Sequence, residues 1–385
     1  MKTSKFITLN LGIKKKLCDG LLIVLPEQSI TSLISTLNKF PAAPVLASKI
    51  NISKCNPRYI FINSGNANAC TGIEGSNNVN LILSTLSKKL KCKNSEIIIM
   101  STGIIGRQLP MKSIIDSISK SPMKNYSSIR DAAKCIMTTD KYPKYLSKSY
   151  QIGSKKILFK GICKGAGMIE PNMATMLGFI ETNIIMDKKN LNKYLKHCAN
   201  LSFNCISVDG DTSTNDCVAF TTSNQISLDL TKKSNEIKFL ECAADFFIQL
   251  ASLIVKDGEG ATKIIQLDVI NAKNKNIAQE ICKKVSHSLL VKTAMHGEDP
   301  NWGRIIASLG SIQSALRNIS KIKLFINNIL CFENGTSKDN GSLKLKKSMK
   351  RNKILITINL DNGKCSQTIY FSDLSKEYVH INSKY

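Results

Sequence analysis

The stretch GMIEPNMATMLGF, from Gly167 to Phe179, places a small residue and a hydroxyl, Ala174 and Thr175, in an apolar run just after Pro171. A threonine in such a run is typical of a strand, where its hydroxyl is usually a satisfied structural group. If the bond before it is cut, however, Thr175 acquires a free α-amine beside its own Oγ, and that amine has an unperturbed pKa of about 8. One residue then supplies both a nucleophile and a general base. The other parts of the chain decide between these two interpretations.

The composition is that of a globular protein with a basic surface. The chain has 385 residues, of which 43% are apolar, enough for two lobes with cores of their own. The net charge of +26 comes from lysines spread along the whole chain, without interleaved aromatic residues or a nucleic-acid motif. No apolar stretch reaches the roughly 20 residues that a bilayer requires, and the basic N-terminus lacks an apolar secretory core. The sequence therefore predicts a cytoplasmic protein with neither a nucleic-acid nor a membrane partner.

Cysteine and histidine spacing argues against metal sites. None of the thirteen cysteines forms a C-x-x-C pair, which excludes zinc ribbons and a small disulfide framework and favours reduced thiols in a cytosol. The four histidines show no HExxH spacing. VDGDTSTND resembles a calcium loop at Asp209 and Asp211, but its sixth position is Thr214 instead of glycine. We therefore expect no metal and no cofactor.

Strand-like and helix-like segments alternate in both halves of the chain. In the first half, two apolar runs each lead into a loop of small and polar residues and then a helical segment, an arrangement that exposes backbone N–H groups at a strand end. In the second half, Asn362-Gly363 supplies the turn of a predicted hairpin. The pattern predicts an α/β or α+β fold. The predicted strands are 59–64, 96–102, 264–270 and 323–329, the predicted hairpin is 354–371, and the predicted helices are 79–91, 111–120, 234–256, 278–290 and one beginning at the N-cap Asp187.

Six segments are rich in small, polar and glycine residues, which are uncommon in a purely structural hydrophobic core. No G-x-S-x-G elbow is present, and KGAGMI lacks the Gly-Lys-Ser/Thr end of a P-loop, so a serine hydrolase and a P-loop enzyme are both disfavoured. A threonine nucleophile remains. The segments are NSGNANACTG (63–72), STGIIG (101–106), KGAGMIEPNMATM (164–176), VDGDTSTND (208–216), DGEGATK (257–263) and HGEDPNWGR (296–304).

These blocks, together with IMTTD and the terminal YVHIN, resemble the bifunctional ornithine acetyltransferase / glutamate N-acetyltransferase family of arginine biosynthesis. The matches follow the family's order from about residue 41 to residue 382. The resemblance implies a two-lobed, self-cleaving enzyme of the N-terminal-nucleophile type with the ornithine acetyltransferase fold. Its precursor would be cut between Ala174 and Thr175 into an α chain, 1–174, carrying the oxyanion hole, and a β chain, 175–385, carrying the nucleophile and the substrate-binding lobe. The cleaved chains would form an α2β2 heterotetramer.

The resemblance also assigns the site residues. Thr175 would take the acetyl group from N-acetylornithine and pass it to glutamate, and family members with broader activity also accept acetyl-CoA as donor. Thr102 and Gly103 match the oxyanion-hole pair, a hydroxyl and a backbone N–H close to the developing charge. A cationic and an anionic side chain suit an amino-acid substrate, which carries a carboxylate and an ammonium. The substrate-contact positions are Thr138, Lys164, Thr175, Glu259 and Asn382.

Some alternatives stay open on the sequence alone. Water could replace glutamate in resolving the acetyl ester, which would make the protein an N-terminal-nucleophile amidohydrolase that releases acetate from N-acetylornithine. A non-catalytic basic binding module is supported only by the charge. The family commonly extends past its terminal tyrosine with a Thr or Ser that touches substrate, whereas this sequence stops at Tyr385. The use of acetyl-CoA is not decided by the sequence, and Trp302 is expected to be a packing anchor.

Overall fold

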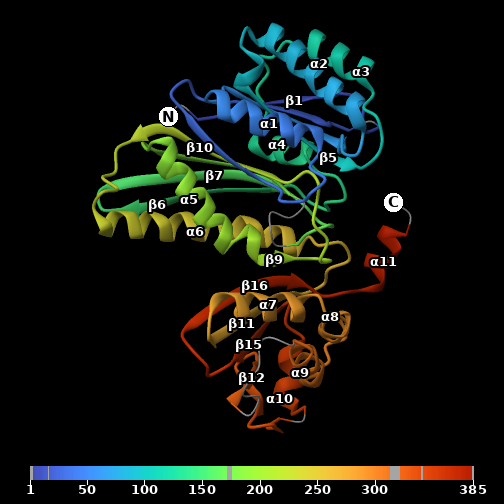
Figure 1. Ribbon diagram of the computed structural model, residues 1–385, viewed down its shortest axis with the longest axis vertical. Helices are drawn as coiled ribbons and strands as arrows, with labels where there is room; N and C mark the ends of the chain where they lie inside the picture. The colour runs from blue at the N-terminus through green and yellow to red at the C-terminus, as the bar shows by residue number, and fades with distance from the viewer. Residues whose placement is uncertain (1–2, 16, 171–175, 313–320, 340, 384–385) are drawn as a thin grey trace. The chain divides into compact units, whose positions relative to one another are not determined.

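The computed structural model describes residues 3–15, 17–170, 176–312, 321–339 and 341–383. The chain forms two compact units, whose elements Figure 1 labels. Unit 1 comprises Met1–Asn204 and Asp211–Ile254, and unit 2 comprises Cys205–Gly210 and Val255–Tyr385. The predicted mixed α/β fold is confirmed. The predicted division into 1–174 and 175–385 is a covalent cut that lies outside the described residues, and it stays a prediction.

The first sheet of unit 1 has the order β1-β2-β4-β5. Its parallel strands β4 and β5 are joined by helix α2, and the runs YIFI and IIIM are buried on both faces, as parallel strands under helices usually are. Helices α2 and α3 cover one face with Val79, Ile82 and Ile114 (Figure 1). The bounds are β1 Lys5–Leu9, β2 Gly20–Val24, β4 Tyr59–Asn66, β5 Ile97–Ile104, α1 Ala43–Lys54, α2 Gly72–Leu90, η1 Asn94–Glu96 and α3 Met111–Lys120.

A second sheet, of order β3-β10-β8-β7-β6, faces the first across a shared core. Ile60 and Ile98 of the first sheet belong to the same apolar cluster as Phe179 and Ala219 of the second. Helices α5 and α6 cover the opposite face of the second sheet (Figure 1), and Phe246 of α6 stacks on a strand phenylalanine. The bounds are β3 Ile30–Ser35, β6 Lys144–Ile152, β7 Lys155–Lys164, β8 Leu177–Ile184, β10 Cys217–Ile226, α4 Ile129–Cys135, α5 Lys188–Leu201, η2 Phe203–Cys205 and α6 Lys233–Lys256.

The position of strand β8 bears on the predicted cut. This strand begins two residues after the cut and lies between β7, which precedes the cut, and β10, which follows it. The register with β7 runs from Phe159↔Thr182 to Lys164↔Leu177, so backbone hydrogen bonds join the two predicted chains within one sheet. Two pieces produced by such a cut would therefore still share a sheet and its core.

Unit 2 contains a sheet of order β14-β13-β12-β15-β11-β16-β9. Alternating residues of β11 and β15, such as Leu267 and Ile356, are fully buried and pack against helices α7, α8, α9 and α10. The bounds are β9 Ile206–Ser207, β11 Ile264–Ala272, β12 Lys323–Ile326, β13 Ile329–Glu333, β14 Thr336–Ser337, β15 Lys353–Asn359, β16 Cys365–Ser372, α7 Lys275–Ser286, α8 Leu289–His296, α9 Trp302–Gly310, α10 Leu343–Met349 and α11 Lys376–Asn382.

The predicted hairpin at 354–371 is wrong. Its two strands exist as β15 and β16, but β11 lies between them, parallel to β15 and antiparallel to β16. The segment around Asn362-Gly363 therefore crosses the end of β11, where Asn362 N donates to Asn271 O. Pairing each strand with β11 places a strongly apolar strand at the centre of the sheet, which a local turn signal cannot reveal.

Two further boundaries differ from the sequence prediction. The helix predicted at 278–290 is broken into α7 and α8, because the Ser288 side chain accepts a hydrogen bond from Val291 N and starts a new helix. The strand predicted at 323–329 is instead a hairpin of β12 and β13. Its turn residues Asn327 and Asn328 both have positive φ, 50° and 64°, a conformation that asparagine adopts more readily than most residues.

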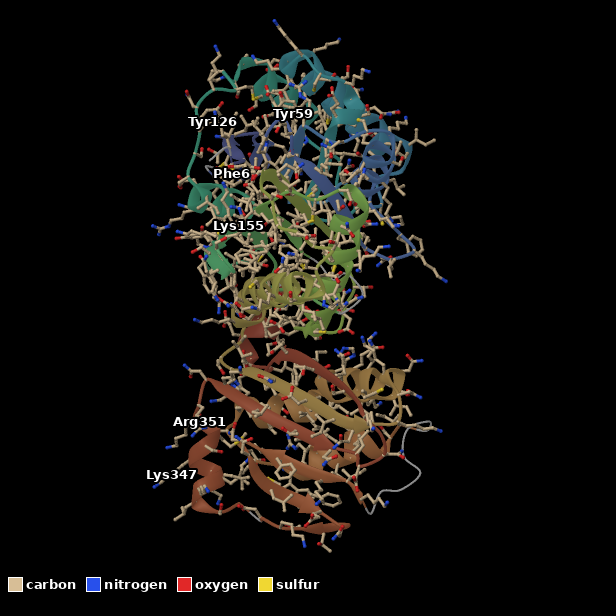
Figure 2. All side chains as sticks on the ribbon, turned by 90° about the vertical axis from the view of Figure 1, so that its left-hand side faces the viewer. Phe6, Tyr59, Tyr126, Lys155, Lys347 and Arg351 are labelled. Carbon is tan, nitrogen blue, oxygen red and sulfur yellow. A yellow bond between two sulfur atoms is a disulfide. The ribbon has the colours of Figure 1, made fainter. Side chains whose placement is uncertain are left out.

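Both units expose basic residues, as expected, although Lys144, Lys164, Lys263 and Lys292 are buried. Lys155 of unit 1 and Lys347 and Arg351 of unit 2 all have exposed side chains, and Figure 2 shows them on the outside of their units. This arrangement fits solvated basic side chains.

Candidate active site

The predicted oxyanion-hole residues lie at the carboxyl end of strand β5. Gly103 pairs in register with Gly65 of β4 and has a φ of +132°, in the region that favours glycine. A Cβ at position 103 would lie only 2.2 Å from the backbone carbon of Gly65. Glycine is therefore required here for the close approach of the two strands.

Thr102 meets another predicted site residue, Lys164. Lys164 ends strand β7, and its ammonium donates a hydrogen bond of 3.1 Å to Thr102 Oγ1. Both side chains are almost fully buried, with exposed fractions of 4% and 3%. Since the Thr102 oxygen accepts from Lys164, its own hydroxyl hydrogen can be directed elsewhere as a donor. The structure thus brings together a predicted oxyanion donor and a predicted substrate contact from separate sequence blocks.

Asp140 fixes the positions of Thr138 and of the end of β7. Its Oδ2 accepts a 2.9 Å hydrogen bond from Thr138 N, and its Oδ1 accepts from Gly165 N at 2.9 Å and from Lys144 Nζ at 2.5 Å. Burial opposes ionisation of Asp140, but the Lys164 and Lys144 ammoniums lower its pKa to about 2. Asp140 therefore stays charged. Sequence reasoning missed its role, although Asp140 ends the quoted block IMTTD.

The block VDGDTSTND fastens the end of strand β5. Asn215 Nδ2 donates to Ser101 O at 2.9 Å and to Ala67 O at 2.6 Å, and its Oδ1 accepts from Thr214 Oγ1. The next residue, Asp216, accepts from Met176 N at 2.8 Å. The sequence had singled out the block but not these two side chains, because only the fold brings them to β5 and β8.

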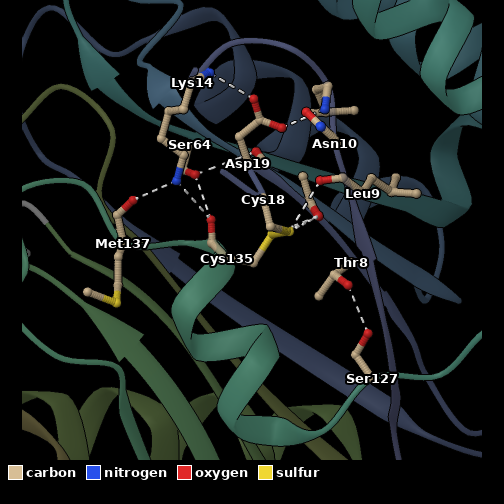
Figure 3. Close-up of a disulfide and its surroundings, with 12 residues drawn as sticks. Thr8, Leu9, Asn10, Lys14, Cys18, Asp19, Ser64, Ser127, Cys135 and Met137 are labelled. Atoms are coloured by element: carbon tan, nitrogen blue, oxygen red, sulfur yellow. Dashed lines mark hydrogen bonds between the residues drawn. A yellow bond between two sulfur atoms is a disulfide. The ribbon is translucent and has the colours of Figure 1, made fainter. Parts of the chain in front are cut away.

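A cavity of about 540 Å³ lies beside this network in unit 1. Lys14 reaches it from the loop after β1, and its ammonium donates to Met137 O at 3.0 Å and to Cys135 O at 3.3 Å (Figure 3). Burial lowers the pKa of Lys14, with Asp19 and Asp140 opposing that effect. The lining has two lysines and two aspartates, Asp131 and Asp140, so its charges suit a ligand that carries both a carboxylate and an ammonium. The lining includes Lys14, Cys18, Lys134, Cys135, Thr138 and Asp140.

The same cavity wall contains a disulfide, which corrects the expectation of reduced thiols throughout. Cys18 and Cys135 are joined (Figure 3), and their Cα atoms are 5.0 Å apart, within the range that the bond requires. They are 117 residues apart in the sequence, so no local spacing could indicate the pair. The other eleven cysteines, all within the described ranges, form no disulfide.

Unit 2 holds the other two predicted substrate contacts, Glu259 and Asn382. Asn382, the last residue of α11, donates from Nδ2 to Glu259 Oε2 at 2.8 Å. Gly260 has a φ of +69°, and a Cβ there would lie 2.5 Å from the backbone nitrogen of Tyr378. The glycine after Glu259 therefore permits the close approach of α11 that brings this pair together.

The block HGEDPNWGR acts as a scaffold in unit 2. His296 Nδ1 lies 2.8 Å from the buried Asp373 Oδ2, which also accepts from Thr262 Oγ1 at 2.6 Å. Trp302 packs on Phe332 with ring centroids 5.6 Å apart, which confirms its prediction as a packing anchor.

The predicted cut at Ala174-Thr175 lies outside the described residues, so the role of Thr175 stays a prediction. Within the described ranges, no group of three or more His, Cys, Asp or Glu residues could hold a metal ion. Nor does this part of the chain include a helix that is long and apolar enough to cross a membrane.

Comparisons with known proteins agree with the resemblance seen in the sequence. The model of the ArgJ family matches residues 5–385. The arginine biosynthesis bifunctional protein ArgJ of Caldanaerobacter subterraneus is 36% identical over 97% of this chain and 94% of its own length. The mitochondrial ArgJ of Dictyostelium discoideum is 38% identical over 97% of this chain and 90% of its own. The crystal structure of ArgJ from Bacillus halodurans has a TM-score of 0.51 and 32% identity, and it covers 54% of this chain and 98% of that one.

Proposed function

Because this chain belongs to the ArgJ family, we propose that it is a self-processing acetyltransferase that moves acetyl from N-acetylornithine to glutamate. The products are ornithine and N-acetylglutamate. The observation that carries this proposal is the family match over nearly the whole chain, together with the Lys164–Thr102 contact beside Gly103. The predicted oxyanion residues and a cation for the substrate carboxylate thus lie together in unit 1.

Self-cleavage comes first in the proposed sequence of events. Thr175 Oγ attacks the carbonyl carbon of Ala174, the peptide C–N bond breaks, and the nitrogen takes up a proton. Water then hydrolyses the resulting ester and leaves Thr175 as the first residue of the new chain. The sheet shared by β7 and β8 supports the view that both products remain associated.

Acetyl transfer uses the same hydroxyl. Thr175 Oγ attacks the acetyl carbonyl of N-acetylornithine, and its α-amine accepts the hydroxyl proton. The hydroxyl of Thr102 and the N–H of Gly103 donate to the oxyanion that forms, and the ornithine amine leaves with a proton. Glutamate then attacks the acetyl ester with its own amine and regenerates Thr175.

The substrate's charged groups match the remaining predicted residues. Lys164 suits the substrate carboxylate, because it is a buried cation within hydrogen-bond reach of Thr102. Glu259 suits an ammonium, and Asn382 holds its carboxylate in place. Thr138 lines the cavity that Lys14 and Asp140 also line. An α2β2 assembly and a cytoplasmic location complete the proposal.

An N-terminal-nucleophile amidohydrolase is the competing function. It would share every residue named above and differ only in the acceptor, which would be water. The relatives at 36% and 38% identity carry the name of an arginine-biosynthesis bifunctional protein, and this favours the acetyltransferase.

The test is an acetyl-transfer assay on purified protein, with products identified by mass spectrometry. With N-acetylornithine and glutamate, ornithine and N-acetylglutamate should appear in equal amounts, and Thr175→Ala should give neither. Free acetate in place of N-acetylglutamate would instead support the amidohydrolase. Acetyl-CoA in place of N-acetylornithine tests for a second donor, and the intact mass of the same sample shows whether the chain is cut at 174/175.

A further inference from the structure

Lys14 is a cation to which the proposed function gives no role. It lies in the loop between strands β1 and β2, and its side chain is half-buried. Its stem passes close to Gly65 at the end of β4, since a Cβ at position 65 would lie 2.8 Å from Lys14 Cγ. Gly65 pairs in register with Gly103, one of the predicted oxyanion residues. The Lys14 stem therefore runs beside the residue that pairs with the predicted oxyanion hole.

The far end of Lys14 holds the segment that leads into Thr138. Its ammonium donates to Met137 O at 3.0 Å and to Cys135 O at 3.3 Å (Figure 3). Met137 O and Thr138 N belong to the same peptide group, and Thr138 N donates to Asp140 Oδ2 at 2.9 Å. A cation thus holds the oxygen of this peptide group, and a carboxylate holds its N–H. Together the two contacts fix the orientation in which the chain enters Thr138.

Lys14 reaches this segment from a distant part of the sequence, 123 residues before Met137. The base of its side chain is also fixed, because Lys14 N donates to Asp19 Oδ2 at 2.9 Å. Burial lowers the pKa of Lys14, the charges of Asp19 and Asp140 oppose that effect, and the charge of Lys164 lowers the pKa further. Lys14 therefore lies within electrostatic reach of Lys164, a second predicted substrate contact.

We propose that Lys14 is a positioning residue for substrate binding, which holds the peptide group before Thr138 and so sets the place of Thr138 in the cavity. The inference rests on the proposed function, in which Thr138 contacts N-acetylornithine, and adds the residue that positions this contact. Lys14 and Thr138 both line the cavity of about 540 Å³. Two of the three ammonium N–H groups of Lys14 already donate to carbonyl oxygens, so Lys14 acts through Thr138.

The test compares three variants of the fully cleaved enzyme. Lys14→Met keeps an unbranched side chain and removes the ammonium, whereas Lys14→Arg keeps a cation that can donate to both carbonyls. Ser64→Ala is the matched control. Ser64 Oγ donates to Cys135 O at 2.7 Å, so its loss removes a contact to the same segment and leaves the peptide group before Thr138 untouched. Ornithine release is followed at increasing N-acetylornithine and saturating glutamate.

We expect Lys14→Met to raise KM for N-acetylornithine at least about 10-fold, the usual effect of losing hydrogen bonds from a charged donor. The kcat should change little, because a contact made equally before and in the transition state affects KM alone. Lys14→Arg and Ser64→Ala should stay close to the native KM. A native KM in Lys14→Met would overturn the proposal, and so would an equal rise in Ser64→Ala, which would trace the effect to a general loosening of the segment.

The double variant Lys14→Met/Thr138→Ala shows whether Lys14 acts through Thr138. If it does, Thr138→Ala already includes the loss, and Lys14→Met raises KM no further in that background. A rise by the same factor in both backgrounds would make Lys14 a substrate contact of its own and reject the positioning role.

Folding and function are separated by two further measurements. If the thermal melt shows that Lys14→Met does not fold, Lys14→Gln, which is neutral and shorter than lysine, takes its place in the same assay. Failure of both to fold would mean that the whole fold needs Lys14, and would reject a role confined to Thr138. A native enzyme that releases no ornithine would reject the proposed function itself, whereas native transfer with an unchanged KM in the Lys14 variants would reject only this inference.

Discussion

Replacing Thr102 by valine removes one hydroxyl and keeps the branched shape of a strand residue. If that hydroxyl donates to the oxyanion, the loss should cost about 3 kcal/mol of transition-state stabilisation, or roughly 10²-fold in kcat. The variant also deprives Lys164 Nζ of the oxygen to which it donates at 3.1 Å. That second loss exists before any substrate binds, so it should appear mainly in KM for N-acetylornithine.

The assay separates these two losses. Fully cleaved enzyme is given increasing N-acetylornithine at saturating glutamate, and ornithine release is followed. Thr102→Ser keeps the hydroxyl and should retain most of kcat. Ser101→Ala is the matched control, because the Ser101 hydroxyl is also buried but donates to Asn63 Oδ1, and neighbouring strand residues point to opposite faces. An unchanged kcat with a raised KM in Thr102→Val would refute the oxyanion role and leave Thr102 as a support for Lys164.

Three other predictions address the nucleophile, the ion pair and the base. Thr175→Ser should still be cut and still transfer acetyl, more slowly than the native chain, as intact mass and ornithine release will show. The pKa of Asp140 in the folded protein is about 2, below its ordinary value of 3.8. The ionised carboxylate therefore contributes its full stabilisation of the fold above about pH 4, and this contribution is lost as the pH falls towards 2. The native chain should therefore lose about 2 kcal/mol more unfolding free energy over that interval than the double variant Asp140→Asn/Lys144→Met, measured by urea unfolding. His296→Asn should leave the rising limb of the transfer rate with pH in place, because the α-amine is the proposed base; loss of that limb with folding intact would identify His296 as the base instead.

Segments with a strong local pattern were predicted well from the sequence. The helix that follows Asp187 is α5: the Asp187 side chain caps it by accepting from Asn190 N, and Leu191 and Cys198 are buried on its inner stripe. Helix α3 begins and ends at the predicted residues 111 and 120. In both cases the signal lies within a few residues of the element that it predicts.

Strand pairing was predicted less well because it depends on distant segments. The turn signal at Asn362-Gly363 is real, yet β15 and β16 each gain more by pairing with the apolar strand β11 than with each other. The disulfide between Cys18 and Cys135 could not be predicted for the same reason, because helix α4 and the loop before β2 meet only in the folded protein.

The candidate site shows the same limit. Thr102, Gly103 and Lys164 were identified from their blocks, but the sequence could not show that Lys164 donates to Thr102. Asp140 and Asp216 lay inside quoted blocks and still had no predicted role. The role of a buried carboxyl group can be recognised only from the groups that contact it, and these groups come from distant parts of the sequence.

The two buried aspartates near Lys164 illustrate how the fold shifts the pKa of the same kind of side chain in opposite directions. The charge of Lys164, the Lys144 ammonium at 2.5 Å and two backbone N–H groups together outweigh the burial of Asp140 and keep it ionised. Asp216 accepts one backbone N–H, and burial outweighs the Met176 N–H, the Lys164 charge and the Ser213 hydroxyl, so the pKa of this carboxyl is raised well above its usual range. Lys164 acts on both carboxyl groups: its charge lowers the pKa of Asp140 and opposes the effect of burial on the pKa of Asp216. Environments that separate the pKa values of two neighbouring acids are a common basis for assigning them different chemical roles.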